Sequence, residues 1–271
     1  MSESTYRAEL TAWQQTKDQV LRGESGWLTV VGLGWLREGI NTIGSDPASD
    51  IALPAAAPGH VGTLELAGGE VTFQPAAAGV QINGAPAGPT VLRNDTHAES
   101  FDLVSFDGIT FFIIQRGQRF GVRIRDADAP ARREFAGRRW FPIDERYRVA
   151  ATLVAYDFPK PIAVTNILGD TVSEASPGYV TFALDGQQLQ LDVVSRDHDQ
   201  LFFVFRDRSG PELSYPIRFL EARLLDDGTV DLDFNRAYNA PCAFTPHATC
   251  PLPPPQNHLP VSIEAGERTT E

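Results

Sequence analysis

The stretch Phe101-Asp-Leu-Val-Ser-Phe-Asp-Gly-Ile-Thr-Phe-Phe-Ile-Ile-Gln115 decides the fold class of this 271-residue chain. It contains two runs rich in apolar and β-branched residues, separated by Asp107-Gly108. Residues of these two types tolerate the positive φ that a two-residue hairpin turn requires. The stretch therefore predicts an antiparallel β-hairpin.

Strand-like runs of the same kind continue on both sides of this hairpin. The first series of expected strands is Trp27–Val31, Ile40–Ile43, Val61–Leu66, Val71–Gln74, Val80–Asn83, Phe101–Phe106, Ile109–Gln115 and Phe120–Arg125. The second series is Val149–Ala155, Ile162–Ile167, Tyr179–Leu184, Leu189–Val194, Leu201–Arg206, Phe219–Leu225 and Val230–Phe234. Turn dipeptides rather than helices separate these runs, which is typical of sandwiches and barrels.

One amphipathic helix precedes the strands. Its apolar residues recur at helical spacing, and Gly23 is placed to cap its end; they are Tyr6, Leu10, Trp13, Val20 and Leu21. We therefore predict a mostly β protein with five parts. These are an N-terminal helix (1–25), a first β-sandwich (26–125), an arginine- and proline-bearing connector (126–148), a second antiparallel β domain, either barrel or sandwich (149–240), and a proline-rich C-terminal strap (241–271).

Composition limits the classes of function. The net charge of −12 argues against nucleic acid as a partner, because phosphate binding requires a positive surface. No apolar run is long enough to span a membrane, and the first residues do not resemble a secretory signal. Two cysteines in a chain of this size suggest a reducing compartment. We expect a soluble, acidic, cytoplasmic protein, and the sequence does not indicate its oligomeric state.

The strap has the most unusual composition of the chain. Both cysteines and seven of the twenty prolines lie between Pro241 and Pro260, so this stretch can be neither a helix nor a central strand. Cys242, His247 and Cys250 could bind a structural zinc ion, but Cys-x7-Cys is not a standard zinc spacing. A disulfide and two buried free thiols are the other interpretations, and we assign no residue to a metal.

The first strand series resembles the forkhead-associated domain, a β-sandwich that binds phosphothreonine peptides. The matching pieces are Gly39–Gly44, Asp50–Leu53, His60 and Ile82–Gly84. Ser45 and Ala57 stand where that family has an arginine and a serine that contact the phosphate. The resemblance therefore implies the sandwich fold without implying phosphopeptide recognition.

Four later segments resemble the bacterial and archaeal domain of unknown function family 1684. They are Arg132–Pro142 with its Phe-x-Gly-x-x-Trp-Phe-Pro core, Leu201–Asp207, Ser214–Leu220, and Asp233 through the strap to Gly266-Glu267. The departures are Ile217, where such proteins have glycine, and Ala240, where proline is usual. This resemblance implies an architecture and no particular reaction.

Polar and aromatic residues gather at expected strand ends and at the start of the strap, where sites tend to lie. As catalytic candidates we take Asp207 and Asp233, either of which could orient a ligand or act as a base. The ligand-binding candidates are Arg139, Trp140, Arg218, Asn235, Tyr238 and Asn239. The arginines would attract an anionic group, and Trp140 would supply an apolar wall.

These residues predict a protein that binds a small molecule, with an anion as one candidate, in a cleft formed by the second β domain and the strap. Catalysis there stays open, and no cofactor is indicated. Two alternatives stand beside this prediction. One is a non-enzymatic interaction module that uses a degenerate forkhead-associated-like sandwich through His60 and Asn83, and the other is a structural zinc protein.

Overall fold

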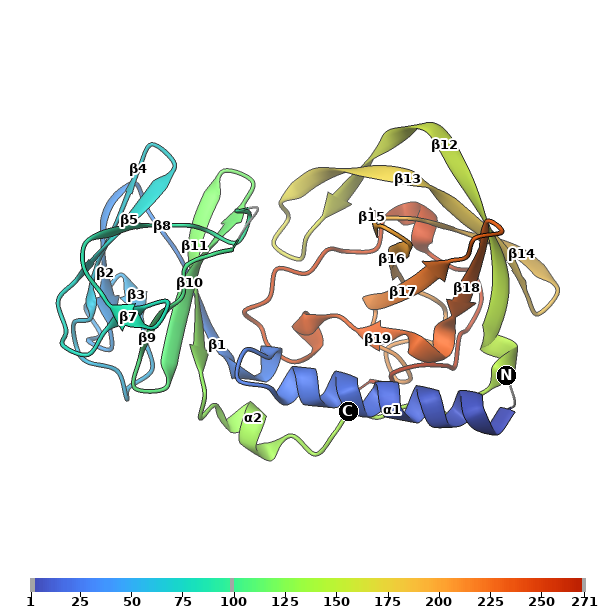
Figure 1. The fold of residues 1–271 in the computed structure, drawn as a ribbon, viewed down its shortest axis with the longest axis horizontal. Helices are drawn as coiled ribbons and strands as arrows, with labels where there is room; N and C mark the ends of the chain where they lie inside the picture. The colour runs from blue at the N-terminus through green and yellow to red at the C-terminus, as the bar shows by residue number, and fades with distance from the viewer. Residues whose placement is uncertain (1–2, 98–99, 270–271) are drawn as a thin grey trace. The chain divides into compact units, whose positions relative to one another are not determined.

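The computed structural model describes residues 3–97 and 100–269, and the chain forms two compact units (Figure 1). Unit 1 draws its residues from Met1–Gln19, Ala136–Ala243 and Thr249–Glu271, and unit 2 from Val20–Phe135 and Phe244–Ala248. The predicted mostly β fold with an N-terminal helix is confirmed, since one long helix precedes three β-sheets.

The helix α1 (Glu3–Arg22) ends directly before Gly23, as the sequence predicted. Tyr6 and Leu10 from its apolar stripe are buried. Val20, which we counted in the same stripe, is 65% exposed. The shorter helices are α2 (Pro130–Glu134), η1 (Trp27–Thr29), η2 (Glu145–Tyr147), η3 (Phe234–Arg236), η4 (Pro241–Ala243) and η5 (Pro255–Asn257).

Unit 2 contains two sheets around one apolar core. The five-stranded sheet has the order β3-β2-β4-β5-β8 and the six-stranded sheet the order β1-β11-β10-β9-β6-β7. Phe73 of one sheet and Phe111 of the other are fully buried and meet edge to face at 5.5 Å. The strands are β1 (Val30–Trp35), β2 (Gly39–Gly44), β3 (Ile51–Ala52), β4 (Gly62–Ala67), β5 (Glu70–Pro75), β6 (Gln81–Ile82), β7 (Ala85–Pro86), β8 (Thr90–Leu92), β9 (Val104–Phe106), β10 (Ile109–Arg116) and β11 (Arg119–Asp126).

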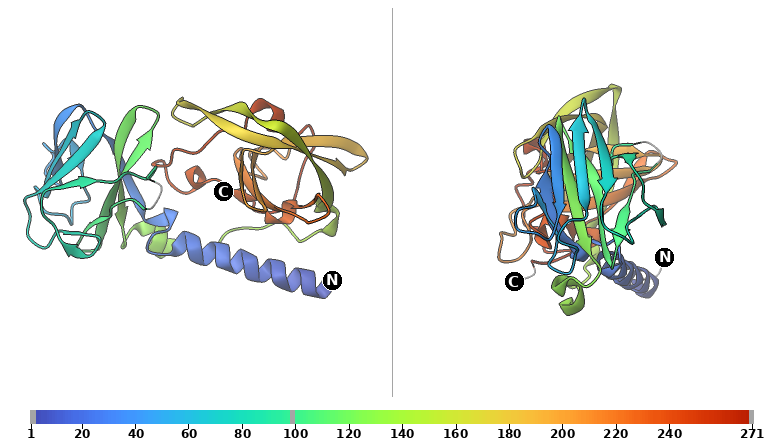
Figure 2. Two further views of the ribbon diagram at one scale, coloured as in Figure 1. Left: turned by 45° about the horizontal axis from the view of Figure 1, so that its top comes forward. Right: turned by 90° about the vertical axis from the view of Figure 1, so that its left-hand side faces the viewer.

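Unit 1 is built on one curled antiparallel sheet of eight strands, ordered β14-β13-β12-β18-β17-β16-β15, with β19 paired to β17. Figures 1 and 2 show how its two longest strands, β12 and β13, bend into a half-barrel. The strands are β12 (Arg148–Thr165), β13 (Thr171–Leu184), β14 (Gln187–Asp192), β15 (Ser195–Asp197), β16 (Gln200–Phe205), β17 (Arg218–Leu224), β18 (Thr229–Asp233) and β19 (Tyr238–Asn239).

Strand β12 joins two strands that the sequence predicted separately. Its pairing with β13 shifts register between Ala155 and Lys160, the interval that contains Pro159, and Pro161 follows directly after it. Proline cannot donate to a ladder and concentrates at bulges, so the sequence suggested a break where the structure has a continuous bent strand.

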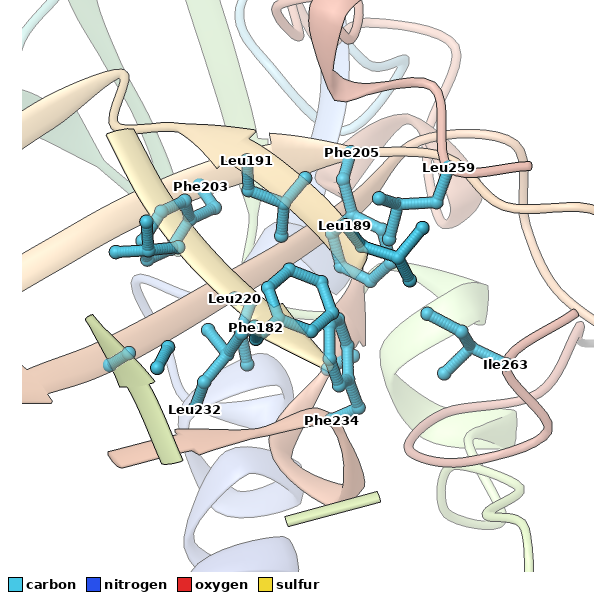
Figure 3. Close-up of a cluster of buried hydrophobic side chains, with 14 of the residues drawn as sticks. Phe182, Leu189, Leu191, Phe203, Phe205, Leu220, Leu232, Phe234, Leu259 and Ile263 are labelled. Atoms are coloured by element: carbon cyan, nitrogen blue, oxygen red, sulfur yellow. The ribbon is translucent and has the colours of Figure 1, made fainter. Parts of the chain in front are cut away.

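The core of the half-barrel is aromatic, and the strap is part of it. Phe234 is fully buried and contacts Phe182 and Phe205, with ring centroids 5.5 and 5.6 Å away. Leu259 and Ile263 from the strap are buried in the same cluster (Figure 3). The strap therefore contributes apolar burial, the main favourable term in folding.

Asn257 of the strap joins the edge strand β14 to β16, which lies next to the other edge strand, β15. Its side-chain amide donates to the carbonyl oxygens of Asp192 at the end of β14 (2.9 Å) and Val204 in β16 (3.0 Å). Its side-chain oxygen accepts from the Asp192 N–H at 2.7 Å. The curled sheet does not close into a full barrel, so backbone groups of Asp192 and Val204 lack a strand partner there. Asn257 is fully buried, and its side chain supplies the hydrogen bonds that these buried backbone groups need.

Candidate functional site

A polar cleft of about 300 Å³ lies on the outer face of the curled sheet. The floor of the cleft is formed by outward-pointing residues of β17 and β18, because side chains alternate between the two faces of a strand. The residues that alternate with them, Leu220, Ala222, Val230 and Leu232, point into the core. Trp13 of α1 forms a wall. The complete lining is Trp13, Gln200, Glu221, Arg223, Asp231, Asp233 and Arg236. The cleft therefore presents carboxylates and guanidinium groups beside one aromatic ring.

Asp233 is the most firmly held group in this cleft. Its carboxylate accepts hydrogen bonds from the Tyr6 hydroxyl (2.9 and 3.0 Å) and from the backbone N–H and side-chain amide of Asn235 (both 3.0 Å). The Arg236 Nε lies 3.5 Å away. Burial, together with the negative charge of Asp233, raises the pKa of Tyr6, so the phenol stays protonated and donates. These bonds fix the orientation of the carboxylate.

Aromatic rings and a lysine support the wall of the cleft. The Trp13 ring lies 5.6 Å from that of Trp140 and 6.4 Å from that of Tyr238. Lys17 Nζ lies 3.9 Å from the centre of the Tyr238 ring and 3.4 Å from Glu221 Oε1, and the Tyr238 hydroxyl donates to the same oxygen at 2.6 Å. Burial lowers the pKa of Lys17. Trp140 and Tyr238, both predicted ligand-binding residues, thus stand behind Trp13.

Asp207 and Arg218 form a completely buried ion pair, with Nη1 and Oδ2 2.5 Å apart. Arg218 also donates to the carbonyl oxygens of Ile263 (3.0 Å) and Ala265 in the strap. Asp207 accepts from the backbone N–H of Ser209 at 2.7 Å. The sequence placed both residues in the site, and the structure brings them together, but neither lines the cleft. Their contacts hold the strap against β17.

Asn239 and Arg139 belong to a second buried group at the end of the strap. The Asn239 N–H donates to Glu267 Oε2 at 2.8 Å, and its side-chain amide donates to the Arg268 carbonyl at 2.9 Å. Arg138 Nη1 lies 2.5 Å from the same Glu267 oxygen. The Arg139 carbonyl accepts from the Arg268 N–H at 2.8 Å. Burial raises the pKa of Glu267 against the opposing effect of Arg138.

The predicted site residues therefore fall into two groups. One group lies in or around the cleft: Asp233, Asn235, Tyr238 and Trp140. The other group contacts the strap, through the sheet side for Asp207, Arg218 and Asn239 and through the segment before β12 for Arg139. The predicted site residues did not include Tyr6, Trp13, Glu221 or Arg236. Alternation in β17 could have identified Glu221, but α1 is more than 200 residues from β18 along the chain, and no local pattern places Trp13 beside it.

The two cysteines lie close to each other and are not joined by a disulfide. The Cys242 N–H donates to Cys250 Sγ at 3.2 Å. A hydrogen bond from Cys250, reinforced by one with Tyr215, lowers the pKa of Cys242 to about 7 despite the opposing effect of burial. Within residues 3–97 and 100–269, no group of three His, Cys, Asp or Glu side chains could hold a metal ion.

We expect Cys242 to react with iodoacetamide as a thiolate at neutral pH. Its alkylation rate should rise through a midpoint near pH 7, whereas an ordinary thiol has a pKa of about 8.5. The buried Cys250 should react much more slowly. Mass spectrometry of the modified peptides measures both rates, and the Cys250→Ala variant should shift the Cys242 midpoint upward. Equal midpoints in the two proteins would show that Cys250 does not acidify Cys242.

Asn83 and Ser45, a match and a departure in the forkhead-associated resemblance, both make internal contacts in unit 2. The Asn83 amide donates to Asp102 at 2.8 Å, and its side-chain oxygen accepts from the Leu103 N–H at 2.9 Å. The Ser45 hydroxyl donates to the Ala57 carbonyl at 2.7 Å. Asn83 and Ser45 thus hold the loops of their own unit.

Comparisons with known proteins give a family but no activity. The family model described as "Protein of unknown function (DUF1684)" matches residues 133–268. An uncharacterised protein of Haloarcula marismortui, solved by solution NMR, is 33% identical over 52% of this chain and 80% of its own, with a TM-score of 0.41. None of the curated proteins matches. In the part of the chain that the structure describes, no helix is long and apolar enough to cross a membrane. The matched segment spans half of the chain, and the chain therefore belongs to the DUF1684 family.

Proposed function

We propose that unit 1 binds a small molecule of the amino-acid class, carrying both a carboxylate and an ammonium group, in the cleft beside Trp13. The observation that carries this proposal is the mixed charge of a small cleft. Glu221, Asp231 and Asp233 supply negative charge, and Arg223 and Arg236 supply positive charge, around about 300 Å³. A ligand with charge of one sign would meet groups of its own sign, whereas a zwitterion meets partners for both.

Two neighbouring groups suit the two ends of such a ligand. The side chain of Arg236 is one-third exposed, and its Nε lies 3.5 Å from Asp233 Oδ2. This distance is longer than a good charge-assisted hydrogen bond. Arg236 can therefore bind a ligand carboxylate with little loss of its interaction with Asp233. Its guanidinium lies 5.5 Å from the Trp13 ring. An ammonium group can lie over an aromatic face near carboxylates such as Asp231 and Glu221, which is a recurrent arrangement for cations.

Binding rather than catalysis fits Asp233 best. A general base needs a free lone pair directed at the proton that it removes. The Asp233 carboxylate already accepts from Tyr6 and Asn235, which favours a positioning role over proton abstraction. Asp207, in its buried pair with Arg218, has no access to a ligand in this cleft. The strap would support the site indirectly, by fixing β17.

Isothermal titration calorimetry with a panel of α-amino acids tests this proposal. We expect saturable binding of at least one amino acid and none of the corresponding simple amine or simple carboxylate. Arg236→Gln should weaken binding tenfold or more, because a hydrogen bond to a charged group contributes about 1.5–3 kcal/mol. Arg196→Gln is the matched control, since Arg196 is an exposed arginine on β15 that does not line the cleft. It should leave binding unchanged.

Two results would contradict the proposal. One is the absence of heat with every amino acid at millimolar concentration. The other is equal affinity of the wild-type protein and Arg236→Gln.

A further inference from the structure

A row of polar side chains crosses four neighbouring strands of unit 2. Gln81 of β6 pairs with Ser105 of β9, Ser105 with Thr110 of β10, and Thr110 with Arg125 of β11. Residues directly opposite each other in a ladder point to the same face of the sheet. With strands about 4.8 Å apart, the row is roughly 14 Å long. It is a series of hydrogen-bonding groups that ends in a cation.

This row forms one side of a cleft of about 490 Å³. The remaining lining comes from the β9–β10 turn and from short segments around it: Glu24, Gly79, Phe106, Asp107, Gly108, Ile109 and Ala127. The volume is in the range of ligand pockets. In residues 3–97 and 100–269, the side chains of Gln81, Ser105 and Thr110 make no hydrogen bond within the protein, so the three groups are available to a ligand.

Arg125 carries a charge that the described part of the protein does not neutralise. Its Nε is buried with no hydrogen-bond partner among the described residues. Neither Glu24 nor Asp107 forms an ion pair with it there, and its guanidinium carbon lies 4.7 Å from the Phe112 ring. Burial alone lowers the pKa of Arg125. A desolvated cation without a carboxylate is costly unless an anion joins it.

We propose that this cleft binds a small polyhydroxylated carboxylate, of the sugar-acid class, with its carboxylate on Arg125 and its hydroxyl groups on Gln81, Ser105 and Thr110. A single negative charge fits better than two, because Glu24 and Asp107 line the same cleft and would repel a phosphate dianion. A neutral sugar would use the hydroxyl partners and leave the cation unpaired. The site lies wholly in unit 2, so it is independent of the cleft beside Trp13.

The test is a titration of the ¹⁵N-labelled full chain with glucuronate, glucose and glucose 6-phosphate, followed by amide chemical shifts. We expect glucuronate to give saturable shifts at Gly108, Thr110 and Arg125, with no saturation by glucose and weaker binding of the phosphate. Arg125→Gln should weaken glucuronate binding tenfold or more, and Thr110→Val several-fold. Arg119→Gln is the control: Arg119 lies on the same strand, stacks on Trp35 at 4.2 Å and does not line the cleft.

Three results would overturn the proposal: no saturable shifts with glucuronate, equal or tighter binding of glucose or glucose 6-phosphate, or unchanged binding in Arg125→Gln. Thermal unfolding separates binding from structure. If the charge of Arg125 serves a ligand, Arg125→Gln should leave the melting temperature of the ligand-free protein unchanged or raise it. A fall of several degrees would assign Arg125 a structural role and would also overturn the proposal.

Discussion

Replacing Arg218 with methionine is expected to lower the free energy of unfolding of unit 1 by about 4 kcal/mol. Methionine preserves most of the apolar stem but leaves the Asp207 carboxylate buried without its partner, and removing one member of a buried ion pair costs about 3–5 kcal/mol. The carbonyl oxygens of Ile263 and Ala265 also lose their donor. Native-state hydrogen exchange of core amides in β16 and β17 measures the change for unit 1 alone.

Arg223→Met is the matched control for this substitution. Arg223 lies on the same strand, and its ion pair with Asp199 is exposed, so its loss should cost about 0–1 kcal/mol. The double variant Asp207→Leu/Arg218→Met should be more stable than Arg218→Met, because it removes the unpaired charge. A loss for Arg218→Met no larger than that for Arg223→Met would show that the buried pair does not hold the strap.

Replacing Asn257 with alanine is expected to lower the free energy of unfolding of unit 1 by about 3 kcal/mol. The side chain makes three hydrogen bonds that join β14 to β16. Each buried backbone group left without a partner costs about 1–3 kcal/mol, reduced where water enters the space. We expect the loss to be local, with faster exchange first at the Asp192 amide, which donates directly to Asn257.

The neighbouring Gln256→Ala is the control for Asn257. Gln256 is exposed in the same short helix and should change stability by less than about 0.5 kcal/mol. If Asn257→Ala left the exchange of the Asp192 amide unaltered, the half-barrel would not depend on this residue for its closure.

Most of the strands could be predicted from the sequence, but the contacts that close the half-barrel of unit 1 could not. Alternation in segments such as Val230–Phe234 and the turn at Asp107-Gly108 identified the strands, because these signals are local. Strands of two or three residues, such as β3 and β19, were missed because they are too short to show alternation. The role of Asn257 was also missed, since one polar residue among prolines has no periodic pattern.

The candidate site was predicted in part for the same physical reason. Asp233 was found because it lies on the polar face of an alternating strand and begins an uncommon stretch of sequence. Asp207 and Arg218 were both selected as site residues, but the sequence does not distinguish charged residues that face a ligand from a charged pair that is completely buried. Trp13 was assigned only to a packing stripe, because the contact between α1 and the sheet is non-local.

The most direct test of the central proposal is a crystal structure of the protein soaked with the amino acid that binds most tightly in calorimetry. We expect the ligand in the cleft of unit 1, with its carboxylate within hydrogen-bond distance of Arg236 and its ammonium group near Asp231 and the Trp13 ring. A ligand bound only elsewhere, for example against strap residues 241–269, would contradict the assignment of this cleft as the functional site.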